Sequence, residues 1–179
     1  MPDFQQLWNQ ALSYDDFVAA SDLKHRGLWH GLHRLARIPG WALAAVPADA
    51  GLKLLVLAED WCGDASNTVP VLAKLTDLAP GLELRILRRD EHPEVMDRYL
   101  TNGSRSIPVV IALDRGFQEL GHWGPRPRML QDWVMEERSK GTPKDRLYPE
   151  VRRWYARDAG ETTLHEVLTA AGLATLRVA

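Results

Sequence analysis

The stretch that decides the fold is residues 54–65, which reads Leu54-Leu55-Val56-Leu57-Ala58-Glu59-Asp60-Trp61-Cys62-Gly63-Asp64-Ala65. Its first five residues form an apolar run typical of a buried strand. Cys62, the only cysteine of the chain, follows in a turn. If this turn leads into a helix, the thiol lies at the helix N-terminus, where free N–H groups and the helix dipole favour the thiolate. Ala65 occupies the position of the second sulfur in a Cys-x-x-Cys motif, so Cys62 cannot close a local disulfide.

The composition describes one compact unit with a substantial core. The chain has 179 residues, of which 45% are apolar, and a net charge of −2. This balance gives no overall attraction to nucleic acid or to an anionic membrane, so we expect neither as a partner. A single cysteine excludes an intrachain disulfide framework and fits a reducing compartment. The N-terminal residues do not resemble a signal peptide and no apolar run approaches 18 residues, so a cytoplasmic location is expected.

The spacing of apolar residues predicts alternating helices and strands. Strands are expected over residues 52–58, 82–87, 108–113 and 117–122, and helices over 3–37 (in pieces), 66–78, 93–100, 129–140, 144–157 and 163–171. In the first helical region, a stripe of leucines at 23, 28, 32 and 35 predicts the face that packs inward. The strands 108–113 and 117–122 are joined by a short turn and form a hairpin, which requires antiparallel pairing. The pattern therefore predicts an α/β fold with a central mixed sheet flanked by helices.

The same residues resemble the thioredoxin superfamily. Trp61-Cys62-Gly63 follows an apolar strand, Pro70 lies eight residues after the cysteine, and Ile107-Pro108 matches the family's Ile-Pro step. With Asp64 next, the chain is similar to single-cysteine members that carry a Trp-Cys-Gly-Asp segment. The resemblance implies a thioredoxin-like domain over residues 51–140, in which the hairpin and the helix after Pro108 are the closing elements. Residues 1–50 and 141–179 are then helical additions, packed with it as one compact unit.

The resemblance also implies a set of site residues. Cys62 would be the catalytic nucleophile, in a turn formed with Gly63, and Trp61 would shape the surface beside the sulfur. Ile107-Pro108 would have a cis peptide bond, face Cys62 and hold the backbone of a partner peptide. We expect Cys62 to be an accessible thiol of low pKa; the alternative is a buried, inert cysteine. Asp64 is expected to be a helix cap or first-turn acid, which could also raise the pKa of the thiol.

Two departures from the family pattern limit the chemistry. Ala65 replaces the resolving cysteine, and Val56 stands where many thioredoxins keep a buried aspartate. The sequence therefore predicts monothiol exchange, or redox-linked protein binding, through Cys62. The partner would be a protein thiol or disulfide, or a small thiol such as glutathione. The alternative is a redox-inactive protein-binding module, so enzyme activity stays open at this point, as does assembly into a homo-oligomer.

Two further features of the sequence are candidate binding sites. His25, His30 and His33 lack another ligand at diagnostic spacing, so no metal site is expected, and no cofactor is predicted. The segment 123–128, with Arg126 and Arg128, is either an anion site, since Arg suits carboxylates, or a loop with solvated arginines.

Overall fold

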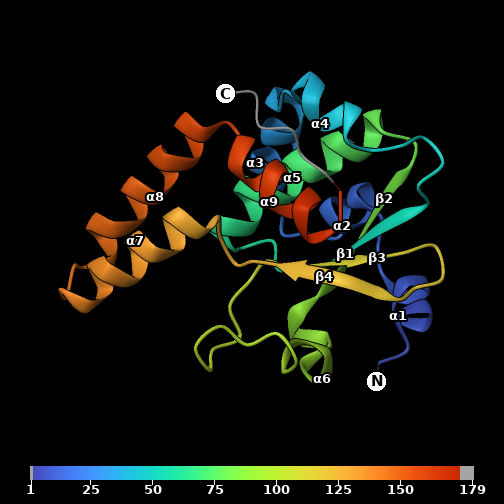
Figure 1. Ribbon diagram of the computed structural model, residues 1–179. Coiled ribbons are helices and arrows are strands. Elements are labelled where there is room, and N and C mark those ends of the chain that lie inside the picture. The colour runs from blue at the N-terminus through green and yellow to red at the C-terminus, as the bar shows by residue number, and fades with distance from the viewer. Residues whose placement is uncertain (1, 174–179) are drawn as a thin grey trace.

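Residues 2–173 are described from a computed structural model of the protein, and their centre is a four-stranded mixed sheet (Figure 1). The strand order is β2-β1-β3-β4. β1 runs parallel to β2 and antiparallel to β3, and β3 runs antiparallel to β4. The bounds are β1 Leu52–Ala58, β2 Leu82–Arg88, β3 Val109–Leu113 and β4 Glu119–Trp123. The predicted mixed sheet is therefore confirmed, with each strand within two residues of its expected start.

Helices surround this sheet. α3, α4, α5 and α9 gather on one side of it, α6 lies on the other side, and α7 and α8 project away from it (Figure 1). The bounds are α1 Phe4–Gln10, α2 Tyr14–Ala19, α3 Leu23–Leu35, α4 Gly40–Ala44, α5 Gly63–Leu78, η1 Arg89–Glu91, α6 Pro93–Met96, α7 Arg128–Ser139, α8 Lys144–Asp158 and α9 Glu161–Ala170. Both terminal segments thus contain the predicted helices, although Met1 and residues 174–179 lie outside the described part.

β1 and α5 together position the thiol. All seven residues of β1 are buried, because the strand lies between β2 and β3 with helices packed over it. The chain leaves the sheet at Ala58, turns, and starts α5 at Gly63 with Cys62 as the N-cap residue. α5 contains Pro70 and buries a broad apolar face against α3, α4 and β2. Cys62 therefore lies in a turn between a fully buried strand and a helix that is largely buried.

The inward face of α3 is not the one that its leucines predict. Leu23, Leu28 and Leu35 are 77%, 54% and 71% exposed, whereas Trp29 is fully buried. The reason is that Trp29 packs its ring against Phe17, with 5.1 Å between the ring centroids. One indole buries more area than any single leucine, so it turns the helix and leaves the leucine stripe outside.

The helix that covers β3 and β4 is α9, whereas α7 packs against α8. α9 buries Leu164, Val167 and Leu168 in the main core. Its close approach requires Gly121 on β4, because a Cβ there would lie 2.5 Å from the Ala170 carbonyl oxygen. The expectation that the helix after the hairpin closes the sheet is therefore wrong, because α7 packs against α8 and the later helix α9 covers β3 and β4.

α7 and α8 form a small cluster of their own. Its buried members are Leu130, Val134, Leu147, Val151 and Tyr155. No helix within residues 2–173 is long and apolar enough to span a membrane.

Candidate functional site

Cys62 lies between the first turn of α5 and the loop that leads into β3. Its Sγ accepts a hydrogen bond from the Ala65 N–H and donates one to the Ile107 carbonyl oxygen, both at 3.5 Å. The Ile107-Pro108 peptide bond is cis. The expectations that this bond is cis and that its loop touches the cysteine turn are confirmed. Ala65, fully buried, contributes only its backbone N–H to the sulfur.

The expectation of an accessible thiol of low pKa is wrong. Cys62 is 8% exposed, because parts of the chain that are distant in sequence cover the turn. Burial raises the pKa of the thiol above its ordinary value, and the negative charge of Asp64 adds to this effect. The hydrogen bond from Ala65 and the positive charge of Arg126 act in the opposite direction but do not prevail. The thiolate is therefore a minor form at neutral pH.

Asp64 is the centre of a buried polar group. It lies in the first turn of α5, as expected, and its side chain is 9% exposed. Arg126 contacts both carboxylate oxygens: its Nε donates to Oδ1 at 2.9 Å, and its second terminal nitrogen lies 2.6 Å from Oδ2. The Tyr155 hydroxyl donates to Oδ1 at 3.0 Å, and Gln131 holds the remaining Arg126 nitrogen at 2.8 Å. The anion that Arg126 binds is thus a carboxylate of this chain.

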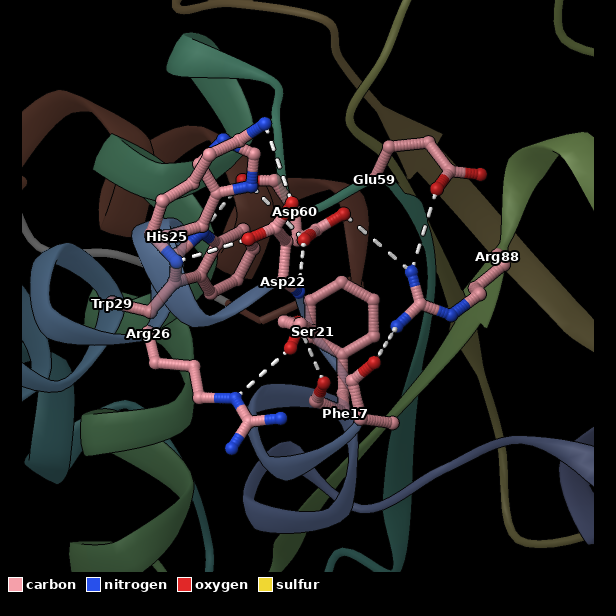
Figure 2. Close-up of polar contacts among 11 residues, drawn as sticks. Phe17, Ser21, Asp22, His25, Arg26, Trp29, Glu59, Asp60 and Arg88 are labelled. Atoms are coloured by element: carbon pink, nitrogen blue, oxygen red, sulfur yellow. Dashed lines mark hydrogen bonds and ion pairs between the residues drawn. The ribbon is translucent and has the colours of Figure 1, made fainter.

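Asp60 joins the same turn to α3 through a second polar network, shown in Figure 2. Its Oδ2 accepts from the Asp22 N–H at 2.8 Å and lies 3.0 Å from His25 Nδ1. Arg88 lies 3.6 Å from Oδ1, and the Trp29 indole donates to the Asp60 carbonyl at 3.0 Å. Burial opposes ionisation of Asp60, yet the hydrogen bonds from His25 and Asp22 outweigh it and lower its pKa. This network fixes the residue that precedes Trp61.

A cavity of about 550 Å³ borders Cys62 and Asp64. Its other walls are largely apolar: Leu28 and Leu32 from α3, Trp61 from the turn, and Tyr148 and Val151 from α8, with Arg152 beside them. Trp61 is 53% exposed, and the Arg89 guanidinium lies over its ring at 5.2 Å. The outward leucine stripe of α3 therefore forms part of the surface beside the sulfur.

The structure brings most of the predicted site residues together. Cys62, Gly63 and Asp64 form the start of α5, Ile107-Pro108 lies against the sulfur, and Trp61 lies at the cavity. Sequence reasoning missed Tyr155 and did not connect Arg126 with Asp64. The stripe Leu147, Val151, Tyr155 at four-residue spacing could have placed Tyr155 on the buried face of its helix.

The histidines make other contacts. His25 pairs with Asp60, and His33 pairs with Asp77 at 2.8 Å. Among residues 2–173, no group of three or more His, Cys, Asp or Glu side chains is arranged to hold a metal ion.

Comparison with known proteins identifies the family. No curated protein matches the chain. Among solved structures, a protein of unknown function from Pseudomonas aeruginosa has a TM-score of 0.77 at 22% identity, and an HIV epitope scaffold has a TM-score of 0.76 at 19% identity. Each alignment covers 96% of this chain and 98% of the other, and shows a shared fold. The family model described as Thioredoxin matches residues 12–140, and the chain, with its thioredoxin-like α/β fold, belongs to the thioredoxin family.

Proposed function

We propose that this protein is a thioredoxin-like thiol protein that forms a one-to-one mixed disulfide through Cys62. The observation that carries the proposal is the position of Sγ, which is held between the Ala65 N–H and the Ile107 carbonyl that precedes the cis proline. A sulfur at this point meets both an N–H donor of the helix start and a backbone edge on which an extended peptide can pair. The partner would be a protein disulfide or a disulfide of a small thiol such as glutathione.

In the exchange step the Cys62 sulfur is oxidised from a thiol to a disulfide, and one sulfur of the partner disulfide is reduced to a thiol. Cys62 loses its proton to solvent, and the thiolate attacks one sulfur of the partner disulfide. A new S–S bond forms to Cys62 while the old one breaks, and the leaving thiolate takes up a proton. Ala65 has no sulfur with which to attack the adduct, so a second thiol from solution must release it. A reducing compartment such as the cytoplasm would supply that thiol.

The environment of Cys62 sets the expected rate. Because burial raises the pKa of the thiol, exchange should be slow at neutral pH and should accelerate as the pH rises toward that raised pKa. The cavity bordered by Trp61 and Leu28 offers an apolar surface on which a partner segment can be held beside the sulfur.

The burial of Cys62 also favours a second candidate function, a protein-binding module without redox turnover. In that case Trp61 and Ile107-Pro108 would bind a partner, and the thiol would contribute shape alone. Binding would then survive replacement of Cys62 by serine, whereas mixed-disulfide formation cannot.

The deciding experiment is incubation of the folded protein with glutathione disulfide between about pH 7 and pH 9.5, followed by intact-mass measurement. That range brackets the ordinary cysteine pKa of about 8.5. We expect one glutathione adduct per chain, formed faster at higher pH and reversed by a reducing thiol. Cys62→Ser is the matched control and should form none. If the folded wild-type chain forms no adduct anywhere in this range, the thiol-exchange proposal is wrong and the binding module is retained.

A further inference from the structure

A buried carboxylate lies two residues after the thiol, and the exchange step makes no use of it. Asp64 and Arg126 have side chains that are 9% and 10% exposed. A buried ion pair is costly to form, because both charges lose their hydration, and it stabilises a fold only when its hydrogen bonds are well satisfied. Here Asp64 is satisfied by Arg126 and Tyr155, and Arg126 is held in turn by Gln131.

Asp64 and its two partners come from separate parts of the chain. Asp64 belongs to α5, Arg126 to the segment between β4 and α7, and Tyr155 to α8, 91 residues from Asp64. α8 meets the main body at this point, since it contacts α5 and has its own apolar cluster with α7. A change in the contacts among Asp64, Arg126 and Tyr155 therefore acts on the first turn of α5, which follows Cys62 directly.

The charged and titratable side chains around Cys62 determine how Asp64 and its partners affect the ionisation of the thiol. α5 supplies Asp64, the segment before α7 supplies Arg126, and α8 supplies Tyr155, with Tyr148 and Arg152 further along the cavity. The loop that touches Sγ contributes the uncharged Ile107 carbonyl. An unpaired carboxylate beside a thiol opposes its ionisation, and a cation that neutralises the carboxylate removes much of that opposition.

We propose that Arg126 and Tyr155 are positioning residues that compensate the charge of Asp64 and thereby set the acidity of Cys62. This inference rests on the proposed thiol function, because it matters only if the sulfur reacts as a thiolate. It assigns each residue a direction of its effect on the ionisation of Cys62. Arg126 favours the thiolate by neutralising Asp64. Tyr155 acts in the same sense but more weakly, since it donates a hydrogen bond without a full charge.

The test is the pH dependence of Cys62 alkylation by iodoacetamide, a neutral reagent whose approach is insensitive to local charge. Asp64→Asn removes the carboxylate and leaves Arg126, whose positive charge favours the Cys62 thiolate, as a cation without its ionic partner. Its profile should move down by roughly one pH unit, which is a tenfold rise in thiolate at a given pH. Arg126→Gln should move the profile up by roughly the same amount, and Tyr155→Phe should move it up by less.

The matched control is Arg128→Gln. Arg128 lies two residues after Arg126 and its side chain is exposed, so this variant removes one positive charge that has no contact with Asp64 in the buried group. Its profile should coincide with that of the wild type. The double variant Asp64→Asn/Arg126→Gln should return close to the wild-type profile, because the two single effects have opposite sign. A purely structural role would instead move both single variants in one direction, toward the profile of an unfolded thiol.

Shifts of the same sign in the two single variants, or shifts no larger than that of Arg128→Gln, would overturn the proposal. If Arg126→Gln does not fold, as judged by its unfolding curve, Asp64→Asn decides alone, and an unchanged or raised profile refutes the proposal. Alkylation requires no partner disulfide. Opposite shifts without any glutathione adduct would therefore defeat the proposed function alone, and an adduct without opposite shifts would defeat this inference alone.

Discussion

Replacement of Asp60 by asparagine should destabilise the protein strongly, because this carboxylate joins the thiol-bearing turn to α3. In the native protein it accepts hydrogen bonds from the Asp22 N–H at 2.8 Å and from His25 at 3.0 Å, and it lies 3.6 Å from Arg88. Its side chain is 10% exposed. Asparagine keeps one acceptor oxygen but has no charge, and its amide nitrogen faces donors.

The magnitude follows from these contacts. A hydrogen bond to a charged group contributes about 1.5–3 kcal/mol. Loss of one such bond, with the other weakened, should lower the free energy of unfolding by roughly 2–4 kcal/mol. For a chain of this size, about 3 kcal/mol corresponds to a decrease of roughly 6–12 °C in Tm. Urea unfolding followed by tryptophan fluorescence measures this difference, since Trp29 is fully buried against the network.

α3 provides a matched control for this prediction. His33 pairs with Asp77 at 2.8 Å, but the Asp77 side chain is 52% exposed. An exposed pair contributes about 0–1 kcal/mol, so Asp77→Asn should be nearly neutral. Equal effects of Asp60→Asn and Asp77→Asn would refute the reasoning, because burial is the property that separates the two pairs.

The difference in the free energy of unfolding between the wild type and Asp60→Asn should also depend on pH, in a defined direction. The hydrogen bonds to Asp60 hold its pKa below the ordinary value. Its contribution to stability is therefore complete above the unfolded-state pKa of about 3.9 and is lost as the pH falls through the lower folded-state value. The wild type and Asp60→Asn should differ by a constant amount from about pH 5 to pH 7 and converge in more acidic solution. A difference that grows on acidification would contradict this sign.

Two further variants test the site. Gly124→Ala should lower the free energy of unfolding and disturb the cis-proline loop, because Gly124 has φ +130° and a Cβ there would lie 2.1 Å from the Pro108 carbonyl oxygen. In Gly31→Ala, the added Cβ lies inside α3 and meets no atom within 4 Å, so this control should instead stabilise the protein by about 0.5–1 kcal/mol. Urea unfolding compares the two variants. Ala65→Cys should introduce dithiol turnover, measured as insulin reduction by a thioredoxin-reductase system, while the natural chain shows little or none; efficient reduction by the natural chain would contradict the monothiol assignment.

The parts of the fold that the sequence predicted correctly depend on short-range patterns. The apolar run of β1 and the helical spacing of α5 are visible in consecutive residues, and they place Cys62 at a helix start. The cis Ile107-Pro108 bond followed from the resemblance to a family. Each of these features depends on residues that are neighbours in the chain or on a motif of known spacing.

The sequence-based expectations were wrong where contacts between residues distant in the chain determine which side chains are buried. The leucines of α3 outnumber its single buried tryptophan, but Trp29 faces inward because its ring packs against Phe17 and its indole N–H donates a hydrogen bond to the carbonyl oxygen of Asp60, 31 residues later. The burial of Cys62 was missed for the same reason, since the groups around it come from α3 and α8 as well as from its own turn. An anion site at Arg126 was one of two alternatives that the sequence left open, and the three-dimensional fold shows that its anion is the Asp64 carboxylate.

The separate apolar cluster of α7 and α8 has a consequence for the order in which the molecule opens. Five buried side chains hold this hairpin together, and it projects from the sheet (Figure 1). Displacing it breaks the Tyr155 contact with Asp64 but leaves β1, α5 and α9 packed in the main core. Such a local opening costs a fraction of the free energy of global unfolding. Val151 of α8 is part of the cavity wall beside Cys62, so the same movement widens the approach to the sulfur. Substitutions in the cluster of α7 and α8 are therefore expected to change access to the thiol while touching neither the sheet nor the sulfur.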